Sequence, residues 1–222
     1  MDPEKKLAAE ASIDFIEDGM VVGLGSGSTV DWMVRKLGEK VLEGLNIKAI
    51  PSSKKTEQLA VEVGVPLTDF ASVDRIDIAI DGADEIDGKL NALKGGGGSL
   101  VREKVVDVNA DQLIIIVDQS KVVDKLGEFP LPVEVLQFGW EITAKQIAEL
   151  GGKPVLRMRD EKPFISDNVN YILDCKFGVI TQPEALHEKL KLLTGVVETG
   201  IFINVVDKVI IGRKDGIVVL KN

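Results

Sequence analysis

The chain contains the segments RIDIAI at residues 75–80, DGADE at 81–85 and KGGGG at 94–98, and this stretch decides the fold. The first segment is a short isoleucine-rich run, which is typical of a buried strand, and LVREKVV at 100–106 is typical of a helix. Four successive glycines cost backbone entropy on folding, so they indicate a backbone that approaches a ligand closely or adopts positive φ. We therefore expect the functional site between this strand and this helix.

Short apolar strands alternate with helices on both sides of this stretch. Strands are predicted at 20–24, 47–50 and 113–117, and helices at 5–17, from Ser28 or Thr29 to 42, and at 54–63 with Ser53 as the cap. This alternation predicts an α/β fold, a Rossmann-like and mostly parallel sheet with helices on both faces. In such sheets ligands lie at the carboxyl ends of the strands, so the segments after Leu24, Ile80 and Val117 should share one edge.

The pattern changes near the two prolines of FPLP at 129–132. Beyond it, strands are predicted at 133–137, 155–158, 169–173 and 196–202, and helices at 141–150 and 183–193. The order β-α-β-β-α-β predicts a smaller α+β, ferredoxin-like second domain. We expect residues 1–128 plus 204–222 to form the Rossmann-like domain and residues 129–203 the second domain, although the tail strands at 208–211 and 216–220 could extend either sheet.

Composition excludes several classes of protein. The 222 residues are 45% apolar and carry a net charge of -9 without a run of Lys or Arg, which argues against a nucleic-acid partner. Cys175 and His187 are single, so neither a disulfide nor a zinc site is expected. The first ten residues contain acids where a signal peptide has its apolar core, and no apolar run approaches the ~20 residues of a membrane span. We expect a cytoplasmic protein without a membrane partner.

A second glycine cluster, GLGSGST at 23–29, lies between a predicted strand and a predicted helix. Amides at a helix N-terminus bind anions, and the hydroxyls of Ser26, Ser28 and Thr29 add donors. A plain tight turn with a capping serine is the alternative. A nucleotide P-loop would need a lysine after the last glycine, a dinucleotide loop a third glycine at Ser28, and a methyltransferase loop an acid just before the glycines. A monophosphate cradle fits best.

Charged side chains follow the other strands. Asp81 and Asp84 follow the strand at 75–80 and are three residues apart, so a turn can direct both into one cleft. Asp-Gly is also a common turn signal, and paired acids also bind Mg²⁺, although Lys94 would compete with a cation. Glu103 lies in the first turn of its helix, where the dipole stabilises a carboxylate, and it suits a general base beside backbone amides. Lys121, after the strand at 113–117, adds a cation to the same edge.

These motifs together resemble the type A ribose-5-phosphate isomerase family. The resemblance rests on GLGSGST, DGADE, KGGGG and REK, in that order, and extends over nearly the whole chain through FPLPVEV at 129–135, KPF at 162–164, NYILD at 170–174 and VETG at 197–200. Two positions depart from the family pattern. Ser26 replaces a frequent threonine and keeps the hydroxyl, and Val169 replaces a common glycine, which affects the shape of that loop.

The resemblance implies that D-ribose 5-phosphate and D-ribulose 5-phosphate are interconverted without a metal or an organic cofactor. It implies Glu103 as the base, Asp81 in ring opening and proton traffic, Asp84 orienting hydroxyls, and Lys94 holding the enediolate. The implied substrate-binding residues are Ser26, Gly27, Ser28, Thr29, Asp81, Gly82, Ala83, Asp84, Lys94, Gly95, Gly96, Gly97 and Lys121. It also implies a homodimer or homotetramer.

Two other functions remain open at this point. A sugar-phosphate sensor could use the same domain without turnover, but the chain offers no basic DNA-binding module, and the presence of Asp81, Asp84, Lys94 and Glu103 favours an enzyme. The other alternative is an isomerase of a different aldose phosphate.

Overall fold

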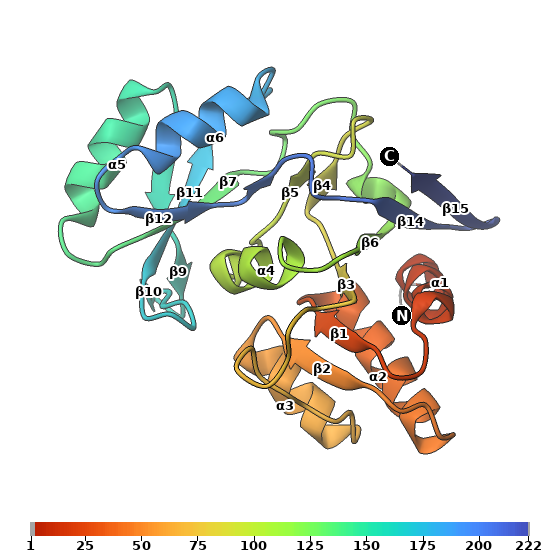
Figure 1. Ribbon diagram of the computed structural model, residues 1–222. Helices are drawn as coiled ribbons and strands as arrows, with labels where there is room; N and C mark the ends of the chain where they lie inside the picture. Colours follow the sequence, from red (N-terminus) through yellow and green to blue (C-terminus); the bar gives the residue numbers. More distant parts are fainter. Residues whose placement is uncertain (1–2, 222) are drawn as a thin grey trace. The chain divides into compact units, whose positions relative to one another are not determined.

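A six-stranded sheet and a four-stranded sheet organise the chain in the computed structural model, which describes residues 3–221 (Figure 1). Met1, Asp2 and Asn222, which the predicted first domain includes, lie outside the described residues. Contacts divide the chain into two units. The first extends to Ala83 and includes Arg102–Val122 and the chain from Asn204 onward, and the second consists of Asp84–Val101 and Val123–Ile203.

The sheet of the first unit has the strand order β15-β14-β6-β3-β1-β2. Its strands are β1 (Val21–Leu24), β2 (Lys48–Pro51), β3 (Ile78–Asp81), β6 (Leu113–Asp118), β14 (Lys208–Arg213) and β15 (Gly216–Lys221). All neighbouring pairs are parallel except β14 with β15. Every residue of β3 and β6 is buried, as expected of strands covered on both faces. The predicted Rossmann-like sheet is confirmed.

Helices cover both faces of this sheet because side chains alternate along each strand. They are α1 (Pro3–Ser12), α2 (Ser28–Leu42), α3 (Lys54–Glu62) and α4 (Leu100–Asp107), with a 3₁₀ helix at Ile13–Phe15. Val22, Ile78 and Ile114 share one core with apolar side chains of α1, α2 and α3. On the other face Gly23 leaves room for Val106 of α4, because a Cβ at Gly23 would lie only 2.5 Å from Val106 Cγ1. No helix in residues 3–221 combines the length and the apolar character needed to cross a membrane.

Helix boundaries differ from the sequence prediction at two points and agree with it at a third. α1 ends at Ser12, whose hydroxyl donates to the Ala9 carbonyl, and the 3₁₀ helix replaces its predicted last turn. Neither Ser28 nor Thr29 caps α2, because Gly27 occupies the N-cap with a φ of 114°, a conformation that glycine adopts easily. The predicted cap of α3 is confirmed, since Ser53 Oγ accepts a hydrogen bond from the Thr56 amide at 3.0 Å.

The second unit contains an antiparallel sheet with the order β12-β7-β11-β8. The elements in chain order are β7 (Leu131–Val135), α5 (Trp140–Glu149), β8 (Lys153–Leu156), β11 (Tyr171–Lys176), α6 (Pro183–Lys191) and β12 (Val196–Thr199). This is the predicted β-α-β-β-α-β order. A hairpin of β9 (Met158–Arg159) and β10 (Lys162–Pro163) lies between β8 and β11. Cys175 is buried in the core of this unit and is a structural residue.

Strand pairing places one segment that the sequence prediction put in the first domain and another that the sequence left ambiguous. β4 (Glu85–Ile86) and β5 (Ala92–Leu93) pair with each other, and β5 pairs with β13 (Ile201–Phe202), so residues 84–101 belong to the second unit. The boundary drawn at residue 128 assigned them to the first. The C-terminal strands join the first sheet, because β14 pairs in parallel with β6 through all of Lys208–Gly212.

Candidate active site

The loop at residues 25–29 lies at the carboxyl end of β1 and leads into α2. The Gly25 amide donates to the Ile80 carbonyl of β3 at 3.0 Å, which ties the loop to the neighbouring strand. The amides at the start of α2, beginning with Ser28 and Thr29, are the donors that a helix N-terminus offers an anion. The sequence therefore located this loop correctly with respect to its strand and helix.

Ser26 is held by a cluster of hydroxyl groups on the segment after β2. Its Oγ lies 3.0 Å from Ser52 Oγ, donates to Ser53 Oγ at 2.9 Å, and lies 3.3 Å from Thr56 Oγ1. Thr56 Oγ1 in turn donates to the Gly25 carbonyl at 2.8 Å. The Ser26 hydroxyl thus fixes the loop to residues 52–56, and the Gly27 amide, Ser28 and Thr29 are the parts of the loop outside this cluster.

Lys5 is a further cation that sequence reasoning did not single out. Its Nζ donates to Ser28 Oγ at 3.2 Å, so α1 brings a positive charge to the start of α2. The helical periodicity around Lys5 indicates only a surface lysine on an amphipathic helix. Lys5 and Ser28 are 23 positions apart in the chain, so no local pattern predicts their contact. Lys121 is the last residue of a short 3₁₀ helix, Gln119–Lys121, which follows β6 at the same edge of the sheet.

Asp81 is the last residue of β3 and is fully buried. The strand was predicted to end at Ile80, so Asp81 lies in the strand and not in the loop. Its Oδ1 accepts hydrogen bonds from the Ser26 amide at 2.9 Å and the Gly82 amide at 2.6 Å. Both bonds fix the direction of the carboxylate and join the segments after β1 and β3. Gly25 is required here, because a Cβ at that position would lie 2.5 Å from Asp81 Cα.

Glu103 lies in the first turn of α4 with only 3% of its surface exposed. The position near the helix N-terminus stabilises a negative charge. α4 is seated against β1 through Val106, whose Cγ1 would lie 2.5 Å from a Cβ on Gly23. The helix is therefore a rigid support for the carboxylate.

In the second unit, Asp84 and the glycine loop are directly connected. Asp84 Oδ2 accepts a hydrogen bond from the Gly96 amide at 2.7 Å. Gly95–Gly98 form a turn, closed by the Gly98 amide on the Gly95 carbonyl at 3.0 Å, with φ of 97° at Gly95. Lys94, only 2% exposed, precedes this turn, and its Nζ lies 5.4 Å from the centre of the Phe202 ring. A buried ammonium and the backbone amides of a glycine turn are groups that can stabilise an oxyanion.

The predicted residues are thus distributed over both units. The first holds Ser26–Thr29, Asp81, Gly82, Ala83, Glu103 and Lys121, and the second holds Asp84, Lys94, Gly95, Gly96 and Gly97. Among residues 3–221 no group of three or more His, Cys, Asp or Glu side chains is arranged to hold a metal ion.

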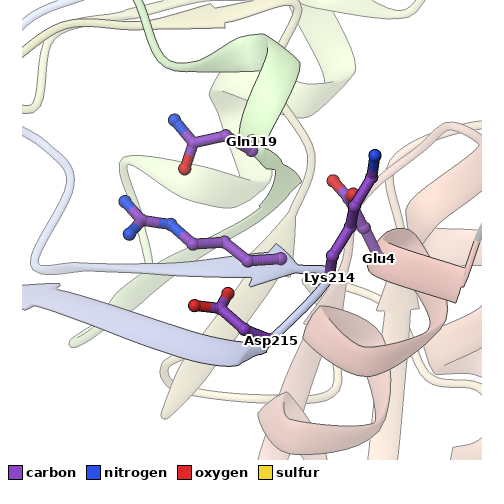
Figure 2. A pocket seen from close by; sticks show the side chains of 5 residues that line it. Glu4, Gln119, Lys214 and Asp215 are labelled. Carbon is purple, nitrogen blue, oxygen red and sulfur yellow. The ribbon is translucent and has the colours of Figure 1, made fainter.

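A separate pocket of about 420 Å³ in the first unit contains none of these residues. Figure 2 shows its labelled lining, with Gln119 on the segment after β6, Lys214 and Asp215 on the turn between β14 and β15, and Glu4 on α1. The lining combines two cations with two acids, so it has no net preference for an anion.

The fold and these residues define a class of protein. A Rossmann-like sheet whose carboxyl edge carries a glycine loop, a helix N-terminus and buried carboxylates is typical of α/β enzymes that act on small anionic substrates.

Comparison with known proteins identifies the family. A family model described as ribose 5-phosphate isomerase A (phosphoriboisomerase A) matches residues 48–216. Ribose-5-phosphate isomerase A 1 of Oceanobacillus iheyensis is 52% identical over 217 residues, which cover 97% of this chain and 97% of that protein. The chain belongs to the ribose 5-phosphate isomerase A family, and the resemblance seen in its motifs is confirmed.

Solved structures share the fold over the whole chain. Ribose 5-phosphate isomerase A from Methanocaldococcus jannaschii is 40% identical with a TM-score of 0.95, covering 99% of both chains. A D-ribose-5-phosphate isomerase in complex with phospho-erythronic acid is 39% identical with a TM-score of 0.97 and covers 100% of both chains.

Proposed function

We propose that this chain interconverts D-ribose 5-phosphate and D-ribulose 5-phosphate, the isomerisation of the non-oxidative branch of the pentose phosphate pathway. The observation that carries the proposal is the match over 97% of both chains to a ribose-5-phosphate isomerase at 52% identity. The chemistry of the residues agrees with it, because aldose-ketose isomerisation needs a base, an oxyanion site and a phosphate site, and the chain has groups for all three.

Glu103 is the proposed base. In the open-chain aldose it removes the C2 proton, the C2–H electron pair forms the C1=C2 double bond, and the carbonyl at C1 becomes an enediolate oxygen. Return of the proton from Glu103 to C1 restores a carbonyl at C2 and gives the ketose. The buried position of Glu103 supports this role, because water competes poorly for a carboxylate that is 3% exposed.

The remaining charged groups are assigned to the oxygens of the sugar. We assign Asp81 to ring opening and to proton transfer between O1 and O2, and Asp84 to orienting hydroxyl groups. Lys94 and the glycine loop, through the amides of Gly95 and Gly97, are assigned to the enediolate, where positive charge and N–H donors stabilise the developing negative charge. The Gly96 amide donates to Asp84 and holds that carboxylate. No step requires a metal or an organic cofactor.

The phosphate is assigned to the first glycine loop. Gly27, Ser28 and Thr29 at the N-terminus of α2 offer amides and hydroxyls, Ser26 supports the loop, and Lys121 adds charge. Lys5, through its bond to Ser28 Oγ, is a second cation at this end. The relative bound to phospho-erythronic acid supports a ligand with a phosphate at one end and two oxygens on a trigonal carbon at the other.

We also propose that the protein is a homodimer or homotetramer that uses the second unit for contact. Phe138 is 96% exposed, and Leu136 and Ile142 nearby are about half exposed or more, which is unfavourable for apolar side chains facing water. Light scattering on the purified chain tests this proposal, and a monomer would refute it. The cytoplasmic location stays a prediction.

Formation of ribulose 5-phosphate by the purified chain tests the proposed function. Ribose 5-phosphate should be converted, and unphosphorylated ribose should be a very poor substrate because it lacks the phosphate. Binding without conversion would favour a sugar-phosphate sensor. Competition among C5 and C6 aldose phosphates separates the proposed substrate from another aldose phosphate, and a better C6 substrate would contradict the proposal.

A further inference from the structure

Arg157 supports the glycine loop of the second unit and has no role in the chemistry proposed above. Arg157, which follows β8, donates through Nη1 to the Gly95 carbonyl at 3.0 Å and to the Gly96 carbonyl at 3.2 Å. Its other nitrogens are occupied by Asp174 on β11, with Nε to Oδ2 at 2.9 Å and Nη2 to Oδ1 at 2.5 Å. Because guanidinium is a rigid planar fork, the bidentate pair with Asp174 sets the direction of the Nη1 donor.

The two carbonyls define which way the loop presents its amides. In a planar trans peptide the C=O and the following N–H point in opposite directions. The peptide between Gly95 and Gly96 is held at both ends, by Arg157 at its oxygen and by Asp84 Oδ2 at its N–H. In the next peptide the Gly96 carbonyl faces Arg157, so the Gly97 N–H is directed to the side away from Arg157.

We propose that Arg157, oriented by Asp174, is a positioning residue that turns the Gly95–Gly97 peptides so that the loop binds the enediolate oxygens. The proposal rests on the proposed function, which assigns the amides of Gly95 and Gly97 to the enediolate. Ordering a glycine loop is entropically costly, because glycine loses more conformational freedom on folding than any other residue. The groups that stabilise a transition state must nevertheless be held within about 0.5 Å of the productive geometry. Arg157 supplies this restraint from outside the loop.

The low exposure of Arg157 and Asp174 favours a specific role for this ion pair, because ion pairs on the surface are largely exposed to solvent. The Arg157 side chain is 13% exposed and that of Asp174 is 29% exposed. Phe164 packs against both the glycine loop and Arg157. A Cβ on Gly98 would collide with the Phe164 ring, and the Arg157 guanidinium lies 5.8 Å from the ring centre. Arg159 lies nearer to that ring, at 4.5 Å, but has no bond to the loop carbonyls. A comparison of Arg157 with Arg159 therefore distinguishes the effect of packing on Phe164 from the effect of the hydrogen bonds to the Gly95 and Gly96 carbonyls.

The test compares Arg157→Met with Arg159→Met. Each removes a cation from the Phe164 ring, and only Arg157→Met releases the two carbonyls. Arg157→Met should lower kcat by on the order of tenfold to a hundredfold, the effect of roughly 1 Å of misplacement, while KM for ribose 5-phosphate changes by less than about threefold. Arg159→Met should keep the wild-type kcat. Equal losses in both variants would overturn the proposal, because packing on Phe164 would then explain them.

Folding is controlled with a second variant. Arg157→Met leaves the Asp174 carboxylate without its cation, whereas Arg157→Met/Asp174→Leu removes both charges. Circular dichroism and thermal unfolding establish that the double variant is folded, and its kcat should be as low as that of Arg157→Met. A folded double variant with wild-type kcat would overturn the proposal.

Binding of phospho-erythronic acid separates this proposal from the proposed function. Its carboxylate presents two oxygens that mimic the O1 and O2 atoms of the enediolate, which lie on the adjacent trigonal carbons C1 and C2. Its dissociation constant measured by calorimetry should therefore rise in Arg157→Met by about the factor lost in kcat. Unchanged affinity would overturn the positioning role. A wild-type chain that bound this acid but formed no ribulose 5-phosphate would refute the proposed function, and the affinities of the variants would still decide the role of Arg157.

Discussion

Gly25→Ala is expected to disable the site through a single added methyl group. The new Cβ would lie 2.5 Å from Asp81 Cα, whereas ordinary van der Waals contact begins at 3.4 Å, so β3 and the loop must separate by about 1 Å. Gly25 itself does not adopt a positive φ, so the cost is steric and not conformational. Asp81 Oδ1 would lose its geometry with the Ser26 amide, which is 2.9 Å in the native loop.

The displacement sets the expected size of the effect. A misplacement of about 1 Å in a catalytic group can cost on the order of 10²-fold in rate, and overpacking a buried site costs about 1 to 3 kcal/mol in the free energy of unfolding. Ribulose 5-phosphate formation measures the first quantity, and denaturant unfolding measures the second. The rate of ribulose 5-phosphate formation and the free energy of unfolding should both be lower in Gly25→Ala than in the wild type.

Gly88→Ala is the matched control, because a Cβ at Gly88 meets no atom within 4 Å and no positive φ is required there. It should leave both the rate and the unfolding free energy near wild type. A Gly25→Ala variant that retained wild-type kcat would refute the reasoning, because the contact between the loop and Asp81 would then not control the site.

Four further outcomes are expected. Glu103→Gln should bind substrate and lose on the order of 10²-fold to 10⁴-fold in kcat, because an amide cannot accept the C2 proton, and near-native turnover would remove Glu103 as the base. Lys121→Ala should raise KM roughly tenfold to a hundredfold with kcat nearly unchanged, since a phosphate contact is made equally in ground and transition states, and a loss confined to kcat would reverse the assigned orientation of the sugar. EDTA should leave activity intact, and loss of activity restored by Mg²⁺ would make Asp81 and Asp84 metal ligands. Burial raises the pKa of the Cys175 thiol, so iodoacetamide should alkylate the unfolded chain and spare the native chain at pH 8, and rapid alkylation of the native chain would contradict this. The free energy of unfolding should also decline as the pH rises above about 8.5, because the thiol ionises there in the unfolded chain and stays neutral in the native one.

Much of the architecture follows from local patterns. The continuous apolar runs at β1, β3 and β6 predicted a parallel sheet, because strands covered on both faces have no polar face to alternate. The same patterns predicted the loop at residues 25–29 and the position of Glu103 in the first turn of α4. These features depend on neighbours within a few residues, which periodicity and helix-end chemistry describe well.

Contacts between distant segments were beyond the reach of these patterns. Ser26 bonds to Ser53, Lys5 bonds to Ser28, and Arg157 bonds to Gly95, each across 23 or more residues, and nothing in a local pattern selects one partner among many. The N-cap of α2 was also missed, because the backbone conformation of Gly27 replaced the expected hydroxyl cap.

By itself the sequence determined the α/β class, the second β-α-β-β-α-β unit and the family, because these depend on periodicity and on motifs that are contiguous in the chain. Only the tertiary structure decided that β5 pairs with β13, that the C-terminal strands complete the first sheet beside β6, and that Arg157 holds the glycine loop. Strand pairing and side-chain hydrogen bonds are formed between segments that folding brings together, and their energy depends on three-dimensional distance and not on separation along the chain.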